Sequence, residues 1–144
     1  MRASGSYQVY ELNTEALSAQ GKWDQAEAEY RKVLAMKLDL PGIHYLIGRL
    51  ILTKPKTPTT FTDAKKEFEE ELKVYPHNAG AEFLLGELAL CTQDYTAAIA
   101  RFSKAAEDDP NFAAAKIELG WALISIHQPA RRCLRWRAVG QGIV

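Results

Sequence analysis

The sequence lacks the features that define several large classes of proteins. Its 18 basic and 18 acidic side chains cancel, so the total charge indicates neither a nucleic-acid nor a membrane partner. No stretch approaches the roughly 18 uninterrupted apolar residues that a transmembrane helix needs. Two cysteines in 144 residues are too few for a disulfide framework. The remaining composition, 47% apolar and 25% charged, is typical of a soluble globular domain.

Residues that could carry chemistry are also scarce. The three histidines, His44, His77 and His127, have no cysteine or carboxylate at the spacing of a metal site, so we expect neither a metal nor a cofactor. The glycines are isolated, so they do not form a phosphate-binding loop. No nucleophile with an acid–base partner is visible, and no catalytic residue is expected. The acid-rich run 67–71 is interleaved with Phe68 and is interpreted as a solvated helix face.

The two ends of the chain differ from its body. The opening MRASGS has one arginine and no apolar run, which is not a signal-peptide pattern. We therefore expect residues 1–6 to be a flexible leader, and a cytoplasmic location is favoured. The last 14 residues hold four arginines and no Asp or Glu, which leaves 14 basic and 18 acidic side chains in residues 1–130. The body is mildly acidic and the tail is basic.

Between these ends, Pro, Gly and Asx residues divide the chain into short blocks with helical periodicity. Apolar residues recur at intervals of three and four, as in Ile99, Phe102 and Ala106. No block alternates with the period of a strand, so the sequence predicts an all-α protein. The expected helices are 7–20, 23–37, 42–54, 61–75, 79–92, 95–108 and 113–126.

Local signals agree with these boundaries. Gly21 can adopt the left-handed conformation that closes a helix. Asp94 can cap the helix that follows it, and Thr60 to Asp63 fit a capping box. Pro76 and Pro110 cannot continue the helices before them.

The helices pair, and the pairs repeat. A glycine in the first helix is followed at fixed distances by an alanine and an aromatic ring in the second helix, as in Gly86, Ala98 and Phe102 before Pro110. Residues 55–58 are interpreted as a four-residue insertion within the second pair. The other members of the series are Thr14, Gly48 and Gly120 at the glycine position, Ala26 and Ala64 at the alanine position, and Tyr30 and Phe68 at the aromatic position.

This spacing resembles the tetratricopeptide repeat, a 34-residue helix–turn–helix unit with Leu-Gly, Tyr, Ala, Phe and Pro at set offsets. The resemblance covers residues 7–126. It departs from the pattern at Leu38, which replaces a proline, and at Glu82 and Lys116, which replace the usual tryptophan. The resemblance implies a right-handed α-solenoid of antiparallel helix pairs with about three and a half repeats, over residues 7–128. The expected units are 7–40, 41–78, 79–112 and the partial unit 113–128.

The repeated residues have a mechanical explanation. We expect the glycines and the alanines to meet where the two helices of a pair cross, because small side chains let backbones approach. The aromatic rings would then fill the wider gap toward the next unit. A larger side chain at Gly86 would overpack the crossing and cost roughly 1–3 kcal/mol.

In proteins of this family, set positions of the first helices line a concave groove. The resemblance implies that the matching residues here would bind a partner helix or extended peptide, with aromatic side chains as anchors. Alternatively, these side chains only pack between neighbouring first helices or are covered by the chain's own ends. The candidate groove residues are Glu11, Glu15, Tyr45, Arg49, Leu52, Phe83, Glu87, Leu90, Ile117, Trp121 and Ile124.

The Arg-rich tail, residues 129–144, fits the repeat imperfectly. Pro129 falls at a first helical position, and Trp136 continues the apolar phase. Arg132, however, falls on the small alanine position, and Gly140 weakens the end of a helix. The tail is therefore either an imperfect second helix that caps residues 113–126 or a mobile segment.

The sequence favours a non-catalytic scaffold that binds a protein or peptide of unknown identity. The alternative is a structural fragment of a larger repeat protein, which self-associates through its C-terminal end and holds no exchangeable ligand. Nucleic-acid binding is not expected, because four arginines without a folded basic face would bind weakly and with strong salt dependence.

Overall fold

The computed structural model describes residues 16–36 and 40–126, and within these ranges helices joined by turns and loops are the regular secondary structure, with no strand. The predicted helices agree with the observed ones to within one residue at every described end, so the all-α prediction is confirmed. Residues 16–19 are also helical. The predicted leader at 1–6 and the tail at 129–144 lie outside the described residues. The bounded helices are α2 (Trp23–Met36), α3 (Ile43–Thr53), α4 (Thr60–Val74), α5 (Ala79–Cys91), α6 (Tyr95–Asp108) and α7 (Ala113–Ser125).

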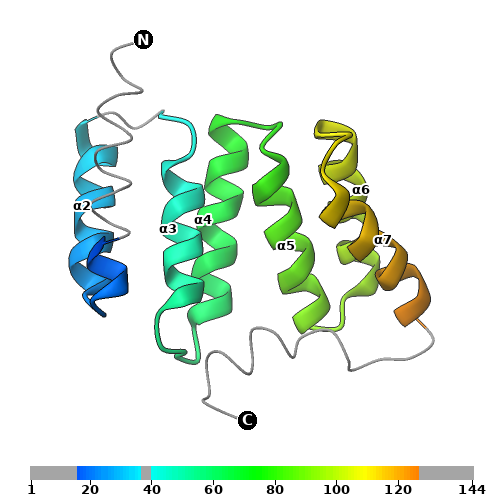
Figure 1. Ribbon diagram of the computed structural model, residues 1–144, viewed down its shortest axis with the longest axis horizontal. Helices are drawn as coiled ribbons and strands as arrows, with labels where there is room; N and C mark the ends of the chain where they lie inside the picture. Colours follow the sequence, from blue (N-terminus) through cyan, green and yellow to red (C-terminus); the bar gives the residue numbers. More distant parts are fainter. Residues whose placement is uncertain (1–15, 37–39, 127–144) are drawn as a thin grey trace.

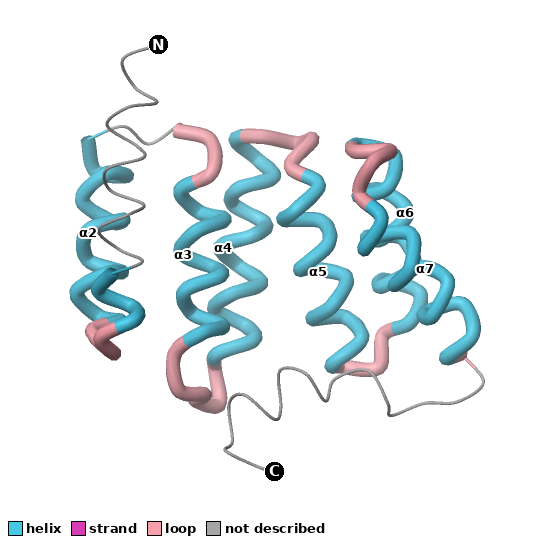
Figure 2. Tube along the Cα trace, viewed as in Figure 1, coloured by secondary structure: helices cyan, strands magenta, loops and turns pink. Residues whose placement is uncertain are grey.

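The helices stand side by side in chain order, from α2 at one end to α7 at the other (Figure 1). Each packs chiefly on its neighbours in sequence, and the most extensive contacts are those of α3 with α4 and of α5 with α6. Short loops join the two helices of a pair at one end and successive pairs at the other (Figure 2). The fold is therefore a row of helix hairpins, in which each hairpin buries its apolar face against the next.

The aromatic rings of the second helices pack directly on the glycines of the first helices. A Cβ atom added at Gly48 would lie 2.5 Å from Cε1 of Phe68, and one at Gly86 would lie 2.6 Å from Cε1 of Phe102. Both rings are fully buried. The nearest side chain over each glycine is thus the ring of its own pair, whereas the sequence analysis expected the rings to fill the gap toward the next unit. We call this arrangement the ring-on-glycine contact.

Helix ends mostly follow their predicted signals. Gly21 has a left-handed φ of 75°, and Asp94 Oδ1 accepts a hydrogen bond from the Ala97 N–H at 3.1 Å. The capping box expected at Thr60 is wrong: Thr60 is already helical, and its hydroxyl accepts from the Thr57 N–H at 2.8 Å. Asn78 caps α5 through its side chain.

We predict that Gly86→Ala lowers the free energy of unfolding by about 1–3 kcal/mol, because the new methyl group must displace the buried Phe102 ring. Chemical denaturation measures the effect. Phe102→Leu serves as the second substitution of a double-mutant cycle. Because it removes the ring that the new methyl group would meet, the double variant should lose less stability than the two single losses added together. A stabilising Gly86→Ala substitution, as expected in an open helix, would contradict the ring-on-glycine contact.

Candidate functional site

The first helices present a row of side chains that we call the first-helix face. It consists of the described candidate groove residues that remain at least partly exposed. They are Tyr45, Arg49, Phe83, Ile117, Trp121 and Ile124.

Two aromatic members of this face, Tyr45 and Phe83, are held by neighbouring rings. Tyr45 lies with its ring centroid 6.1 Å from that of Phe68, at a tilt of 49°. Phe83 lies 5.6 Å from Phe102 and 5.0 Å from Phe112. Both Tyr45 and Phe83 are half-buried. Each ring therefore has a fixed orientation and still presents part of its surface to solvent.

A positive charge lies one turn beyond the first of these rings. Arg49 is exposed, and its guanidinium carbon lies 5.7 Å from the Tyr45 ring centroid, which is a cation–π distance. Arg49 also borders a small cavity of about 170 Å³ between α2, α3 and the helical residues near Ser18. This end of the face can bind a carboxylate beside an apolar group.

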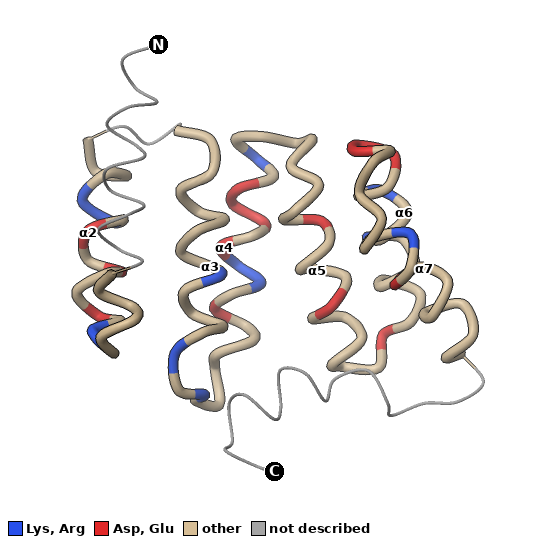
Figure 3. The backbone as a smooth tube through the Cα atoms, viewed as in Figure 1, with Lys and Arg blue, Asp and Glu red and all other residues tan. Residues whose placement is uncertain are grey.

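The other end of the face is apolar. Ile117, Trp121 and Ile124 of α7 are 57%, 47% and 59% exposed. No charged residue follows Glu118 in α7, and the second half of the helix carries none in Figure 3. We call the exposed apolar residues of this helix and its end the α7 apolar face: Ile117, Trp121, Leu123, Ile124 and Ile126.

The remaining candidate groove residues lie elsewhere. Leu52, Glu87 and Leu90 are buried, and Leu52 is completely inaccessible, so these three side chains belong to the packing between helices. Glu11 and Glu15 lie outside the described residues.

A buried carboxylate that the sequence analysis misread fixes the start of α3. Glu71 is fully buried and accepts hydrogen bonds from the Gly42 N–H at 2.6 Å and the Tyr45 N–H at 3.3 Å. It also accepts from Asn78 Nδ2 at 3.1 Å. The unpaired N–H groups and positive dipole at a helix N-terminus favour such a carboxylate. Glu71 thereby positions Tyr45 on the first-helix face.

Glu67, one turn earlier, belongs to a second polar group, which is partly buried. Its carboxylate accepts from His44 Nδ1 at 2.7 Å and from Arg31 Nη2 at 2.9 Å. Burial alone raises the pKa of Glu67, but the hydrogen bonds from His44 and Arg31 outweigh it and hold the pKa below 4.5. Arg31 also binds Glu27, which binds Lys54 at 2.9 Å. These contacts join α2, α3 and α4.

The interpretation of 67–71 as a solvated face is therefore wrong for two of its residues. Glu67 and Glu71 are four apart and share the buried side of α4 with Ala64 and Phe68. Their spacing could have indicated this burial, because residues three and four apart from Ala64 and Phe68 lie on the same side of the helix. Glu69 and Glu70 lie on the partly exposed side.

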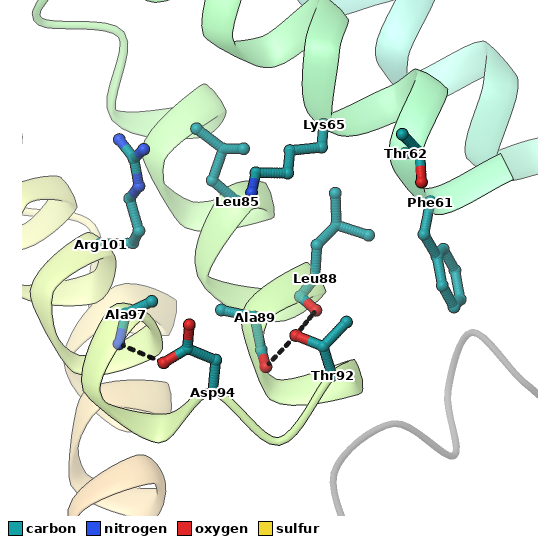
Figure 4. Close-up of a pocket in the computed structure, with 10 residues that line it drawn as sticks. All are labelled: Phe61, Thr62, Lys65, Leu85, Leu88, Ala89, Thr92, Asp94, Ala97 and Arg101. Carbon is teal, nitrogen blue, oxygen red and sulfur yellow. Dashed lines mark hydrogen bonds between the residues drawn. The ribbon is translucent and has the colours of Figure 1, made fainter. Parts of the chain in front are cut away.

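A larger cavity of about 310 Å³ lies between α4, α5 and α6 (Figure 4). Leu85, Leu88 and Ala89 give it an apolar floor. Polar groups at its edge are engaged within the protein: Asp94 caps α6, and Arg101 donates to Glu82 at 3.0 Å. The cavity therefore has an apolar base, and these two polar side chains at its edge already bind other groups of the protein, so they do not form an acid–base pair.

Over the part of the chain that the structure describes, no group of three His, Cys, Asp or Glu side chains could hold a metal ion. Within residues 16–36 and 40–126, no helix has the length and apolarity needed to cross a membrane.

Comparison with known proteins agrees with the repeat geometry. Residues 60–111 match the tetratricopeptide repeat family. The crystal structure of MamA has a similar fold, with a TM-score of 0.67 and 18% sequence identity over 90% of this chain and 73% of that one. No curated protein sequence matches the chain. Residues 60–111 therefore match a family whose repeats in general serve protein interaction and are typically non-catalytic, and the described chain has a helical-repeat fold.

We predict a shallower acid dependence of stability for Glu67→Gln. Because folding lowers the pKa of Glu67, its carboxylate stabilises the fold at pH values well above the usual glutamate pKa, and this contribution is lost as the pH falls through the lowered value. Denaturant unfolding between about pH 3 and about pH 7 measures the slope. Glu69→Gln is the control, because Glu69 lies 4.0 Å from Lys65 on an exposed surface. Equal slopes for wild type and Glu67→Gln would contradict the assignment.

Proposed function

We propose that the chain is a non-catalytic scaffold whose first-helix face binds a segment of a protein partner. The observation that carries the proposal is the recurrence of exposed side chains at matching positions of α3, α5 and α7. Tyr45, Phe83 and Ile117 share one position, and Arg49 and Trp121 share another, four residues further along. The repeat packing leaves part of each of these side chains exposed.

The chemistry of the face defines the partner segment. Aromatic and aliphatic side chains dominate from α5 to α7, so the segment should present apolar residues there. At the α3 end, Arg49 favours a carboxylate and Tyr45 supplies an adjacent ring. An extended or helical segment with apolar anchors and an acidic residue at one end fits this order.

We predict that Arg49→Glu/Trp121→Ala weakens partner binding at least about tenfold, because it reverses the charge and removes the largest exposed anchor. Partners captured from lysate by the wild type would be identified and titrated against purified variants. Met36→Ser/Lys73→Glu is the matched control, since it changes one exposed apolar side chain and one exposed cation on second helices. Equal loss in both double variants, or no loss in either, would contradict binding on the first-helix face.

A second candidate function is structural: a segment of a larger array that self-associates through its C-terminal end. The α7 apolar face favours it, because adjacent exposed apolar side chains often mark an interface. This candidate predicts a mass that rises with protein concentration in sedimentation experiments. It also predicts that Ile124→Asp restores the monomer. A monomer at every concentration would contradict it.

A further inference from the structure

Helix α4 borders two corresponding cavities, each between successive second helices. One, of about 270 Å³, lies between α2 and α4 over Ile51 of α3. The other is the cavity of about 310 Å³ between α4 and α6, over Leu85, Leu88 and Ala89 of α5. We call them the α2–α4 cavity and the α4–α6 cavity. The α4–α6 cavity shares no lining residue with the first-helix face, so the two surfaces are separate.

Ion pairs cross the α2–α4 cavity. Arg31 of α2 binds Glu67 of α4 at 2.9 Å, and it also binds Glu27 on its own helix. Glu27 in turn binds Lys54, at the end of α3, at 2.9 Å. All four side chains line the cavity, so its charges are paired within the protein.

The α4–α6 cavity has a different charge pattern. Lys65 takes the repeat position of Glu27 once the insertion at 55–58 is counted, and it reverses the charge there. Its side chain is 59% exposed and contacts Glu69 of its own helix at 4.0 Å, which is a long distance for an ion pair. Within the described residues, no ion pair links α4 to α6 across this cavity.

Arg101 supplies a second cation from the facing helix, and Leu85 lies between Lys65 and Arg101 in Figure 4. A guanidinium group carries five N–H donors, and the bond to Glu82 engages one of them. The carboxylate that lines the cavity, that of Asp94, caps the N-terminus of α6, where the helix dipole favours a negative charge. The cavity therefore combines an apolar base with cations on both walls.

We propose that the α4–α6 cavity binds a segment of a protein partner in which an acidic residue follows a leucine. The leucine side chain lies over Leu85 and Leu88, and the carboxylate lies between Lys65 and Arg101. Cavities for small molecules begin at about 300 Å³, so this one suits a single large side chain rather than a cofactor. A protein segment is favoured over a free acid, because one exposed ion pair binds weakly unless neighbouring contacts along α4 and α6 add to it.

Methyl NMR of the full chain with a defined peptide tests the proposal. The probe is the peptide acetyl-Leu-Glu-Leu-amide, and the matched peptide acetyl-Leu-Gln-Leu-amide lacks the charge. The acidic peptide should bind about two- to fivefold more tightly than the glutamine peptide, which is the difference that one exposed ion pair provides. The methyl signals that should shift on binding are those of Leu85, Leu88, Ala89 and Ala97.

Three variants separate charge from shape. Lys65→Gln should remove the preference for the acidic peptide, because it removes the less engaged of the two cations. Lys73→Gln is the matched control, since Lys73 is an exposed cation of the same helix that does not line the cavity. Ala97→Leu should abolish the methyl shifts, because its larger side chain fills the cavity without changing any charge.

Several results would overturn the proposal. Methyl signals that stay unshifted at the highest soluble peptide concentration would show that the cavity does not bind the segment. Equal affinity for the two peptides, or an unchanged preference in Lys65→Gln, would show that the carboxylate is not recognised. Isocaproate, a free acid with a leucine-like side chain, would have to bind more weakly than the acidic peptide, since equal binding would identify a site for small acids.

The same titration distinguishes this cavity from the first-helix face. Arg49→Glu/Trp121→Ala should leave the shifts at Leu85 and Leu88 unchanged, because neither substituted residue lines the cavity. Shifts at Ile117 and Ile124 in their place would locate the peptide on the first-helix face and contradict binding in the α4–α6 cavity.

Discussion

The fold depends on one steric relation, in which an aromatic ring of one helix lies on a glycine of the helix before it. Any side chain at Gly48 or Gly86 would occupy the volume that the Phe68 or Phe102 ring now fills. The ring fixes how closely the two helices approach, and it also supports the neighbouring ring of Tyr45 or Phe83. The same contact that closes each hairpin therefore orients the side chains available for binding.

Polar contacts act both within the second hairpin and between it and its neighbours. Glu71 and Glu67 lie on the buried side of α4. They bind groups on α2, on α3 and in the loop before α5. A buried carboxylate is stable only when its acceptors are paired, so these contacts hold specific helices in a specific order. Aromatic and carboxylate contacts therefore both close the second hairpin, and the Arg31–Glu67 pair joins this hairpin to α2.

Much of this could be predicted from the sequence. Helix positions follow from periodicity and from strong stop signals such as Gly21, Pro76 and Pro110, and the repeat follows from glycine and ring spacing. The partner of each glycine could not be predicted, because spacing identifies a crossing without saying which nearby side chain fills it. The burial of Glu71 and of Leu52 was also missed, since both depend on how neighbouring hairpins stack. The candidate face was only partly predictable for the same reason. A residue can match a groove position of the family and still be covered by the next helix, as Leu52 is.

The family and the fold support protein interaction in general, and the exposed row from Tyr45 to Ile124 suggests where a partner would bind. The fold and the position of the exposed row both depend on the ring-on-glycine contact. Proton NMR can detect this contact directly. The Hα protons of Gly48 and Gly86 should be shifted upfield by the ring currents of Phe68 and Phe102 and show nuclear Overhauser contacts to those rings. Unshifted Hα protons without such contacts would contradict the account.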